Sequence, residues 1–476
     1  MASAAQPNRD PADRRGSWRR WTWIQEVLAT LSLSAPIAAG LLAEMGMSVA
    51  DYVMAGRLGA ADLAAAGLGV QMLFVFHLLP MGAIGSVSAL GAQAHGAGDA
   101  AMVSRVVRQG LRFATCLALP ACLIILAVAP LLRLSGHYEN QIVDWIGTLL
   151  LLGMASIPAV LWFTVLRNYV TVLGRPVVVT IIILGALPLT LLGNYVTMYG
   201  AFGFPAMGVP GIGLTMSIVQ WLQLISLVVY INRDSMLRSY HVFSDLLRHD
   251  KAIFIDLWRV GWPIAAGYAF ESGLFMVSTL LMGEFGVATL AAHNAVINLT
   301  SISFMIPYSI SQAATVRVGY AIGRGAARDA RRSGYIAICL SMIWMLFAAM
   351  ALSFMPHTLL SLYMNVNDPA NAAAVAMGVT LMPIAALFQL VDGLQVATIG
   401  SLRGLKDTKV PMILCGCGYW AAGLGSGYLL AFNFGFAGPG LWWGLAIGLV
   451  VSAALLFLRW KQMAHRYVVG MAAIPT

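Results

Sequence analysis

The stretch Pro36-Ile37-Ala38-Ala39-Gly40 recurs without change as Pro263-Ile264-Ala265-Ala266-Gly267, 227 positions further along the chain. The same offset, with no gap, aligns a pair of glutamates, a second pair of prolines and several glycines. A chance alignment of this length is improbable, because Ala and Gly alone would not bring prolines and glutamates into register. The chain is therefore a tandem repeat of two halves. The matching pairs include Glu44 and Glu271, Gly59 and Gly286, Pro80 and Pro307, Gly96 and Gly323, and Gly98 and Gly325.

The composition is that of a membrane protein. Of the 476 residues, 60% are hydrophobic and only 10% are charged, whereas a soluble domain carries about 25% charged residues. The mean hydropathy is +0.81. Many apolar runs reach about 20 residues, the length that a helix needs to cross a hydrocarbon layer. These features exclude a soluble enzyme, a disordered chain and a disulfide-rich scaffold, and they predict an all-α polytopic membrane protein.

Charges, prolines and glycines divide the chain into twelve predicted spans, six in each half. An even number in each half makes the two repeats parallel, related by a pseudo-two-fold axis along the membrane normal. Secondary transporters use such repeats and bind their substrates where the repeats meet. The predicted spans are 25–55, 62–93, 109–132, 141–166, 174–199, 208–232, 254–283, 288–316, 334–363, 371–401, 409–433 and 439–459.

The distribution of basic residues sets the orientation of these spans. All but two of the 28 Lys and Arg residues, Arg57 and Arg133, fall in the terminal segments or in alternate connections. Cytoplasmic connections of membrane proteins carry such an excess of Lys and Arg. This pattern explains the net charge of +9 without a nucleic-acid partner. We therefore expect a multi-pass protein of the cytoplasmic (inner) membrane with both termini in the cytoplasm.

The repeat and the charge pattern together predict the domain organisation. We expect a disordered cytoplasmic tail over 1–24 and a first lobe over 25–232. A charged cytoplasmic linker over 233–251 would lead to a second lobe over 252–463 and a tail over 464–476. Each lobe would contain six membrane-spanning helices.

Four acidic residues fall well inside the predicted spans: Glu44, Asp51, Glu271 and Asp392. A charge at the centre of a membrane helix costs about 2.5–3.5 kcal/mol even on a lenient scale, so each acid needs a partner, a proton or water. At a rise of about 1.5 Å per residue from the nearest basic residue, Glu271 and Asp392 lie near the midplane. Asp51 lies one heptad after Glu44, on the same face of the first helix.

We expect no Lys or Arg inside the spans to neutralise these acids. Mobile cations, either H⁺ or Na⁺, are then their natural partners, and a cavity with several carboxylates would also attract organic cations. The alternative is a carboxylate with only a structural role, held by hydrogen bonds to neighbouring groups. Among the four acids, this interpretation applies best to Glu44.

Five amide side chains add hydrogen-bonding capacity at a similar depth and are candidates for binding substrate or cation. Each of them could serve instead as a contact between helices. They are Gln71, Asn194, Asn294, Asn298 and Gln389.

The sequence contains no nucleotide-binding P-loop, no HExxH or GxSxG motif and no cluster of Cys and His at metal-binding spacing. We therefore expect no cofactor and no enzymatic activity, with an ion gradient rather than ATP as the source of energy.

Four stretches carry a family resemblance. The sequence MSVADYVMAGRLG, from Met47 to Gly59, resembles the first-helix signature of MATE (multidrug and toxic compound extrusion) transporters of the NorM branch. The resemblance extends over the chain after residue 25, with the order and spacing of the family. The other matching stretches are GAQAHGAGD at 91–99, AAHN at 291–294 followed by Asn298, and SLRGLKD at 401–407.

The resemblance implies a V-shaped pair of six-helix lobes that exports cationic, lipophilic drugs in exchange for Na⁺ or H⁺. The family's first-helix acid falls on Asp51, and its cation-binding carboxylates fall on Glu271 and Asp392, which would also be the ligands of Na⁺. Phe388 stands where some Na⁺-coupled members carry Tyr, and Thr190 stands where relatives carry Asn. Both departures leave the coupling ion open.

A flippase for a lipid-linked saccharide, from the same (MOP) superfamily, is the alternative function. Such a protein handles anionic pyrophosphate lipids, so its cavity should carry Arg or Lys rather than acids. For the antiporter, the expected partners are small organic cations and the lipid bilayer, and we expect a monomer.

Overall fold

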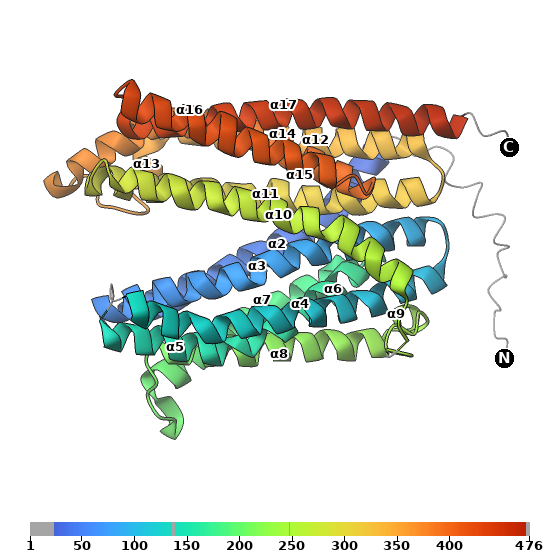
Figure 1. Ribbon diagram of the computed structural model, residues 1–476, viewed down its shortest axis with the longest axis horizontal. Coiled ribbons are helices and arrows are strands. Elements are labelled where there is room, and N and C mark those ends of the chain that lie inside the picture. Colours follow the sequence, from blue (N-terminus) through green and yellow to red (C-terminus); the bar gives the residue numbers. More distant parts are fainter. Residues whose placement is uncertain (1–22, 136–138, 247, 473–476) are drawn as a thin grey trace, which may run out of the picture.

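The structure is a computed structural model that describes residues 23–135, 139–246 and 248–472. Every regular element in these ranges is a helix, and the helices lie side by side along the long axis of the molecule (Figure 1). Apart from its last two residues, the predicted tail over 1–24 falls outside the described residues. The helices of the first half are α2 (Trp23–Gly56), α3 (Ala60–Gly96), α4 (Ala100–Ser135), α5 (Asn140–Met154), α6 (Ser156–Val172), α7 (Pro176–Tyr199) and α8 (Pro210–Arg233).

The second half begins after the short helix α9 (Ser235–Arg238). Its predicted tail over 464–476 is helical as far as Ala472, because α17 continues to that residue. The remaining helices are α10 (Lys251–Gly283), α11 (Val287–Gly323), α12 (Ala327–Phe354), α13 (Pro356–Leu360), α14 (Ala372–Gly404), α15 (Lys409–Gly416), α16 (Gly425–Tyr428) and α17 (Ala437–Ala472).

The prediction of twelve membrane spans is confirmed. In the described ranges, eleven helices are long and apolar enough to cross a membrane, and the bent pair α5 and α6 supplies the twelfth span. The bend is 42° and falls at Ala155, between the two helices. The predicted span 409–433 is continuous but alternates α-helical turns with π-helical turns at Cys417–Leu424 and Leu429–Asn433.

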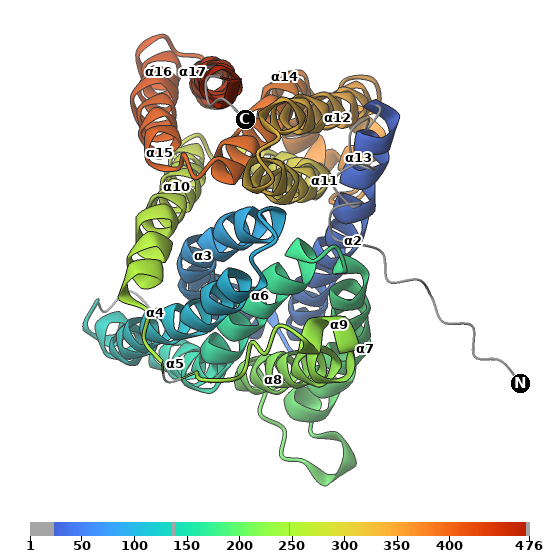
Figure 2. The same cartoon turned by 90° about the vertical axis from the view of Figure 1, so that its right-hand side faces the viewer.

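The helices form two bundles of six spans, seen end-on in Figure 2. Leu73 and Leu161 belong to the apolar core of the first bundle, and Leu381 and Trp442 belong to that of the second. The first core also includes Ile253 and Leu257 from the start of α10, which therefore packs on both bundles. The predicted architecture of two six-helix lobes is therefore correct. We call the bundle of α2 to α8 the first lobe and the bundle of α10 to α17 the second lobe.

The two repeats turn at equivalent places, one after α3 and the other after α11. Gly98 and Gly325 both have φ of +75°, a left-handed conformation that favours glycine. The residue after each glycine donates its N–H to the carbonyl five positions before it, at 3.1 Å after Gly98 and 2.9 Å after Gly325. This hydrogen bond satisfies a carbonyl at the end of the helix. The glycines that align in the sequence therefore have the same structural role in both repeats.

One end of the molecule carries α9, the start of α10 and the end of α17 (Figure 1). We call it the terminal end, and we call the opposite end the far end. Helices α3 and α11 both end here, at Gly96 and Gly323.

The lobes contact each other closely where α3 and α11 meet at the terminal end. A Cβ atom added to Gly96 would lie 2.1 Å from the carbonyl oxygen of Tyr320, and one added to Gly323 would lie 1.9 Å from that of Gln93. Gln93 and Tyr320 are themselves related by the 227-residue offset. The contact is therefore reciprocal, like the interface of a two-fold dimer. Gln93 also reaches across the lobes, because its Nε2 donates to the carbonyl of Gly404 at 2.9 Å.

The segment between α8 and α10 is bound to the first lobe. The Tyr169 hydroxyl donates to the Leu237 carbonyl at 2.8 Å, and Gln109 Nε2 donates to the Arg248 carbonyl at 2.9 Å. Asp234 caps α9 by accepting N–H bonds from Met236 and Leu237 at 3.0 Å. The bond from Leu237 is the main reason why the pKa of Asp234 is lowered.

The reciprocal glycine contact yields a prediction. Replacing Gly323 by Ala forces α3 and α11 apart, because the new methyl group would meet the backbone of Gln93, which cannot move alone. We expect the variant to lose about 1–3 kcal/mol of stability, as other overpacked sites do, and to show a lower Tm in thermal unfolding of the purified protein. Gly185→Ala is the matched control, since a Cβ added at this helical glycine meets nothing within 4 Å. Equal Tm values for the two variants would contradict the close contact.

Candidate functional site

Asp51 and Asn194 form a buried pair inside the first lobe. Asp51 lies on α2 with 3% of its surface exposed, and Asn194 lies on α7 with none exposed. The Nδ2 group of Asn194 donates to Oδ1 of Asp51 at 2.5 Å. Asp51 makes no ion pair in the described part of the chain, so its charge is compensated only by this amide. Such a carboxyl group can gain a proton or a cation without first breaking a salt bridge.

Glu44, one heptad before Asp51, has a different environment. The Nη1 atom of Arg167 lies 3.3 Å from Oε1 of Glu44, and the Arg167 side chain is only 15% exposed. Arg167 belongs to α6, which continues to Val172, six residues beyond the predicted end of that span. The expectation that no Lys or Arg would lie near the buried acids is therefore wrong for Glu44. The apolar stretch of this segment ends before the helix does. Arg167 therefore lies on the last turns of α6 and not in a connection.

Glu271 of α10 and Asp392 of α14 lie inside the second lobe. Asp392 is buried, with 8% of its surface exposed, and Glu271 is half-buried. The charges of the two carboxylates act on each other. Glu271 lines a small cavity of about 30 Å³ together with Tyr268, Arg403 and Tyr419.

Arg403 compensates part of this negative charge from a short distance away. Its Nη1 atom donates to the Tyr268 hydroxyl at 3.2 Å, and its guanidinium lies over the Tyr268 ring, 5.2 Å from the centroid. The Tyr268 and Tyr308 hydroxyls are 2.9 Å apart. Arg403 interacts electrostatically with Glu271, but no ion pair within 4.0 Å involves Glu271 or Asp392 among the described residues. Sequence reasoning placed Arg403 in a connection and missed the two tyrosines.

The other candidate residues take two kinds of position. Gln389 is fully buried and bridges helices, since its Nε2 donates to the Thr300 carbonyl at 3.1 Å and to the Ser303 hydroxyl. Phe388 is buried between aromatic rings, 6.2 Å from Phe275 and 6.0 Å from Trp442. The side chains of Gln71, Asn294 and Asn298 are exposed. Thus the structure brings together Asp51 with Asn194 and Glu271 with Asp392, and it leaves the other candidates apart from these pairs.

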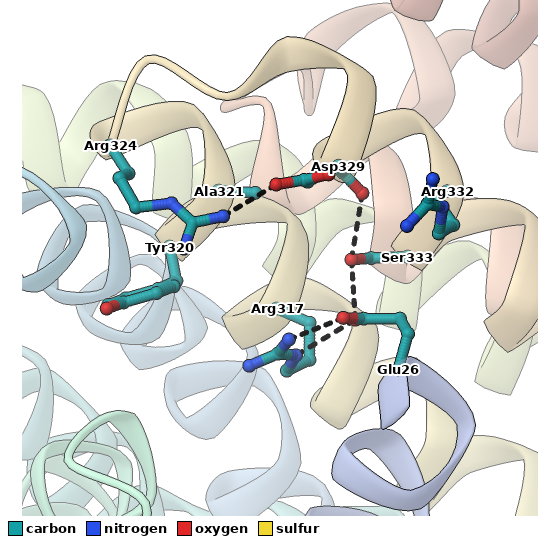
Figure 3. Close-up of a pocket in the computed structure, with 8 residues that line it drawn as sticks. All are labelled: Glu26, Arg317, Tyr320, Ala321, Arg324, Asp329, Arg332 and Ser333. Atoms are coloured by element: carbon teal, nitrogen blue, oxygen red, sulfur yellow. Dashed lines mark hydrogen bonds and ion pairs between the residues drawn. The ribbon is translucent and has the colours of Figure 1, made fainter. Parts of the chain in front are cut away.

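A second polar centre, which sequence reasoning missed, joins the two lobes at the terminal end (Figure 3). Glu26 of α2, 3% exposed, accepts two hydrogen bonds from Arg317 of α11, at 3.0 Å from Nε and 2.5 Å from Nη2. The hydroxyl of Ser333 on α12 donates to the same carboxylate at 2.6 Å. We call these three residues the terminal latch. An acid at the start of the first apolar helix was the only sign of it in the sequence.

The terminal latch combines strong pairing with burial. A two-point contact between guanidinium and carboxylate fixes the relative position of the two side chains. If one member of a buried pair is removed, the other remains buried without its counter-charge, which is unfavourable. Because Glu26 comes from the first lobe and both partners come from the second, the latch holds the lobes together on the same side as the glycine contact.

We expect Glu26→Gln to lower the stability of the protein by about 1–3 kcal/mol, because the two charge-assisted hydrogen bonds from Arg317 then lose their carboxylate acceptor. The double variant Glu26→Gln/Arg317→Gln should recover part of the loss in Tm. Arg133→Gln is the control, because the Arg133–Asp144 pair is 60% and 54% exposed and is worth at most about 1 kcal/mol. A drop in Tm no larger than that of the control would argue against the latch.

Comparison with known proteins agrees with this architecture. Residues 36–196 and 263–429 match the family model described as MatE, once in each repeat. The probable multidrug resistance protein NorM of Mesorhizobium japonicum is 38% identical over 445 residues, covering 92% of this chain and 94% of that protein. The multidrug resistance protein NorM of Burkholderia vietnamiensis is 36% identical over 431 residues, covering 90% of this chain and 92% of that protein.

Solved structures show the same fold at lower identity. The eukaryotic MATE transporter AtDTX14 superposes with a TM-score of 0.82 at 19% identity, over 94% of this chain and 99% of that one. A multidrug resistance MATE transporter described in an outward-facing conformation gives a TM-score of 0.82 at 17% identity, over 93% and 96% of the two chains. The family match in both halves and the relatives above 30% identity show that this chain belongs to the MatE family of membrane transporters, within its NorM branch.

Proposed function

We propose that this protein is a secondary active antiporter that exports cationic, lipophilic compounds in exchange for Na⁺ or H⁺. The observation that carries the proposal is the set of three buried or half-buried carboxylates, Asp51, Glu271 and Asp392, that make no ion pair within 4.0 Å among the described residues. Their charge must be met by a mobile cation, by a proton or by cargo. The named relatives, described as multidrug resistance proteins, support the choice of cargo.

Exchange follows if the ion and the cargo stabilise different arrangements of the lobes. Loading Asp51 and the pair Glu271 and Asp392 with a cation neutralises buried charge, whereas a bound organic cation replaces that ion. Two ligands with different affinities for two arrangements are coupled by necessity. We propose that rocking of the lobes, over 25–232 and 252–463, about the linker 233–251 then exposes the sites to each side in turn.

Of the two coupling ions, we favour H⁺. A Na⁺ ion at Glu271 and Asp392 would have two carboxylates, but neighbouring Phe388 offers it no oxygen. Arg403 also places a positive charge within reach of Glu271. A proton needs only one carboxylate oxygen, which each of the three acids supplies.

The flippase alternative has less support. Its anionic substrate would be repelled by Asp51, Glu271 and Asp392, which make no ion pair within 4.0 Å among the described residues, whereas Arg167 and Arg317 are each paired with a glutamate. A structural relative from Pyrococcus furiosus is described as having a binding pocket of reverse polarity that suggests a different function. The acids of the present chain are the feature that separates the two functions.

We further propose that the protein acts as a monomer in the cytoplasmic membrane, with the terminal end in the cytoplasm. The terminal end carries α9 and the basic residues of the linker, in agreement with the positive-inside rule. No cofactor takes part in this mechanism.

We expect Asp392→Asn to abolish drug efflux, measured in everted vesicles, because the amide can no longer exchange a proton or hold a cation. The protein should still insert and unfold at a Tm close to that of the wild type, since the amide keeps the size of the side chain. Glu284→Gln, an exposed acid beyond the end of α10, should transport normally. Undiminished efflux by Asp392→Asn would refute the proposed role.

The coupling ion can be tested with the purified protein in liposomes. We expect an imposed pH gradient alone to drive movement of a fluorescent organic cation, and a Na⁺ gradient alone at equal pH to drive none, because Phe388 offers no oxygen to Na⁺ and Arg403 places a positive charge near Glu271. Liposomes with the Asp392→Asn variant serve as the control for leakage. Transport driven by the Na⁺ gradient alone would identify Na⁺ as the coupling ion and contradict the choice of H⁺.

A further inference from the structure

A groove of about 460 Å³ lies on the first lobe, beside the segment that connects the lobes. This volume is within the range of about 300–1,000 Å³ that is typical of ligand pockets. Figure 2 shows one of its walls, α8, on the side of the first lobe that is remote from the second lobe. None of the carboxylates discussed above lines the groove. Its walls include Leu111, Arg112, Trp162, Trp221, Ile225 and Leu246.

One part of the groove is apolar. The rings of Trp162 on α6 and Trp221 on α8 meet edge to face, with centroids 6.0 Å apart. Both indole N–H groups are bonded within the protein: Trp162 donates to the Thr115 hydroxyl at 3.0 Å and Trp221 donates to the Ala155 carbonyl at 2.9 Å. The tryptophans therefore have no hydrogen bond left to offer to a ligand. A hydrocarbon chain fits such a surface.

The other end of the groove is charged. Arg112 donates from Nε to the Leu246 carbonyl at 2.7 Å. In the described part of the chain its two terminal nitrogens have no hydrogen-bond partner. Two other arginines on the same side of α4 are matched with acids, since Arg105 lies 3.7 Å from Asp250 and Arg108 lies 3.7 Å from Asp245. Arg112 is thus the basic residue of this row that keeps its donors available to a ligand.

The position of the connecting segment fixes the depth of Arg112. Irregular backbone does not face lipid within the hydrocarbon region, because its polar groups would lack partners there. The exposed, non-helical residues around Leu246 therefore lie at or outside the boundary of the hydrocarbon. Arg112, bonded to that backbone, lies at the level of the lipid headgroups, and the two tryptophans lie on the hydrocarbon side. The order of charge and apolar surface along the groove is that of a phospholipid.

We propose that this groove binds one anionic phospholipid, with its phosphate at Arg112 and an acyl chain along Trp162 and Trp221. Negative charge is required because Arg112 brings an unmatched positive charge to the site, and basic pockets at this level of membrane proteins recognise anionic headgroups. Because Leu246 belongs to the connecting segment and lines the groove, the lipid also holds this segment against the first lobe.

The proposal can be tested by native mass spectrometry of the full-length protein in detergent. The protein is titrated with dioleoylphosphatidylglycerol, with dioleoylphosphatidylcholine and with inorganic phosphate. We expect one retained phosphatidylglycerol at low lipid concentration, much less phosphatidylcholine and no retained phosphate. Arg112→Gln should weaken phosphatidylglycerol binding about fivefold, the effect of one basic residue near an anionic lipid.

Two further variants make the test specific. Arg328→Gln removes a positive charge from an exposed residue at the start of α12 in the second lobe, and it should bind lipid like the wild type. Ile225→Trp fills the apolar part of the groove, and it should lose phosphatidylglycerol while keeping the wild-type Tm. This variant also tests the proposal if Arg112→Gln fails to fold.

Several outcomes would overturn the proposal. Equal retention of phosphatidylglycerol and phosphatidylcholine would mean that the groove does not select for charge. Binding of inorganic phosphate alone would mean that it holds an anion without a lipid chain. Unchanged phosphatidylglycerol binding by Ile225→Trp would place the bound lipid elsewhere.

Discussion

The dominant constraint on this structure is the cost of placing a carboxylate inside a membrane-spanning bundle. Two of the carboxylates inside the bundles, Glu26 and Glu44, meet that cost with an arginine. Asp51 has only an amide partner, while Glu271 and Asp392 add to each other's charge. A salt bridge supplies a permanent counter-charge, so Glu26 and Glu44 can stabilise the fold without binding a mobile cation. The remaining three make no ion pair within 4.0 Å among the described residues, and for this reason we propose them as the coupling sites of the transport cycle.

The tandem repeat places an equivalent backbone contact from each half where the lobes meet at the terminal end, but it does not impose identical chemistry on the two lobes. Gly96 and Gly323 approach each other's repeat in the same way, so the two-fold relation of the halves is kept where the lobes touch. Glu44 and Glu271 also occupy equivalent positions in the sequence, yet only Glu44 has an ion pair among the described residues. The repeat therefore preserves the contact between the lobes while the environments of the equivalent acids differ.

Much of this architecture could be predicted from the sequence because it depends on properties that are local or repeated. The hydrophobic spans, the repeat offset and the cost of buried acids led to two six-helix lobes and to the residues Asp51, Glu271 and Asp392. The partners of the acids could not be predicted, because they lie far away in the chain. Glu26 meets Arg317, which is 291 positions distant, and Glu44 meets Arg167, which is 123 positions distant. Apolar stretches also end before the helices do, so basic residues such as Arg167 and Arg403 were assigned to connections although they lie on helices.

The terminal end has a further asymmetry, because the connecting segment is bound to one lobe only. Hydrogen bonds from Tyr169, Gln109 and Arg112 tie it to the first lobe, whereas the latch of Glu26 with Arg317 and Ser333 joins the lobes directly. A rocking motion that opened this end would have to break the latch and the contact of α3 with α11, but it could leave the bonds of the connecting segment intact. The segment would then move with the first lobe together with the first turns of α10, because Ile253 and Leu257 belong to the core of that lobe and Phe254 packs edge to face on Phe113. Opening of the terminal end would break the hydrogen bonds of the latch and the close contact of α3 with α11, whereas the hydrogen bonds of the connecting segment would remain. The latch and the helix contact would therefore contribute more than the connecting segment to the free-energy difference between closed and open terminal ends.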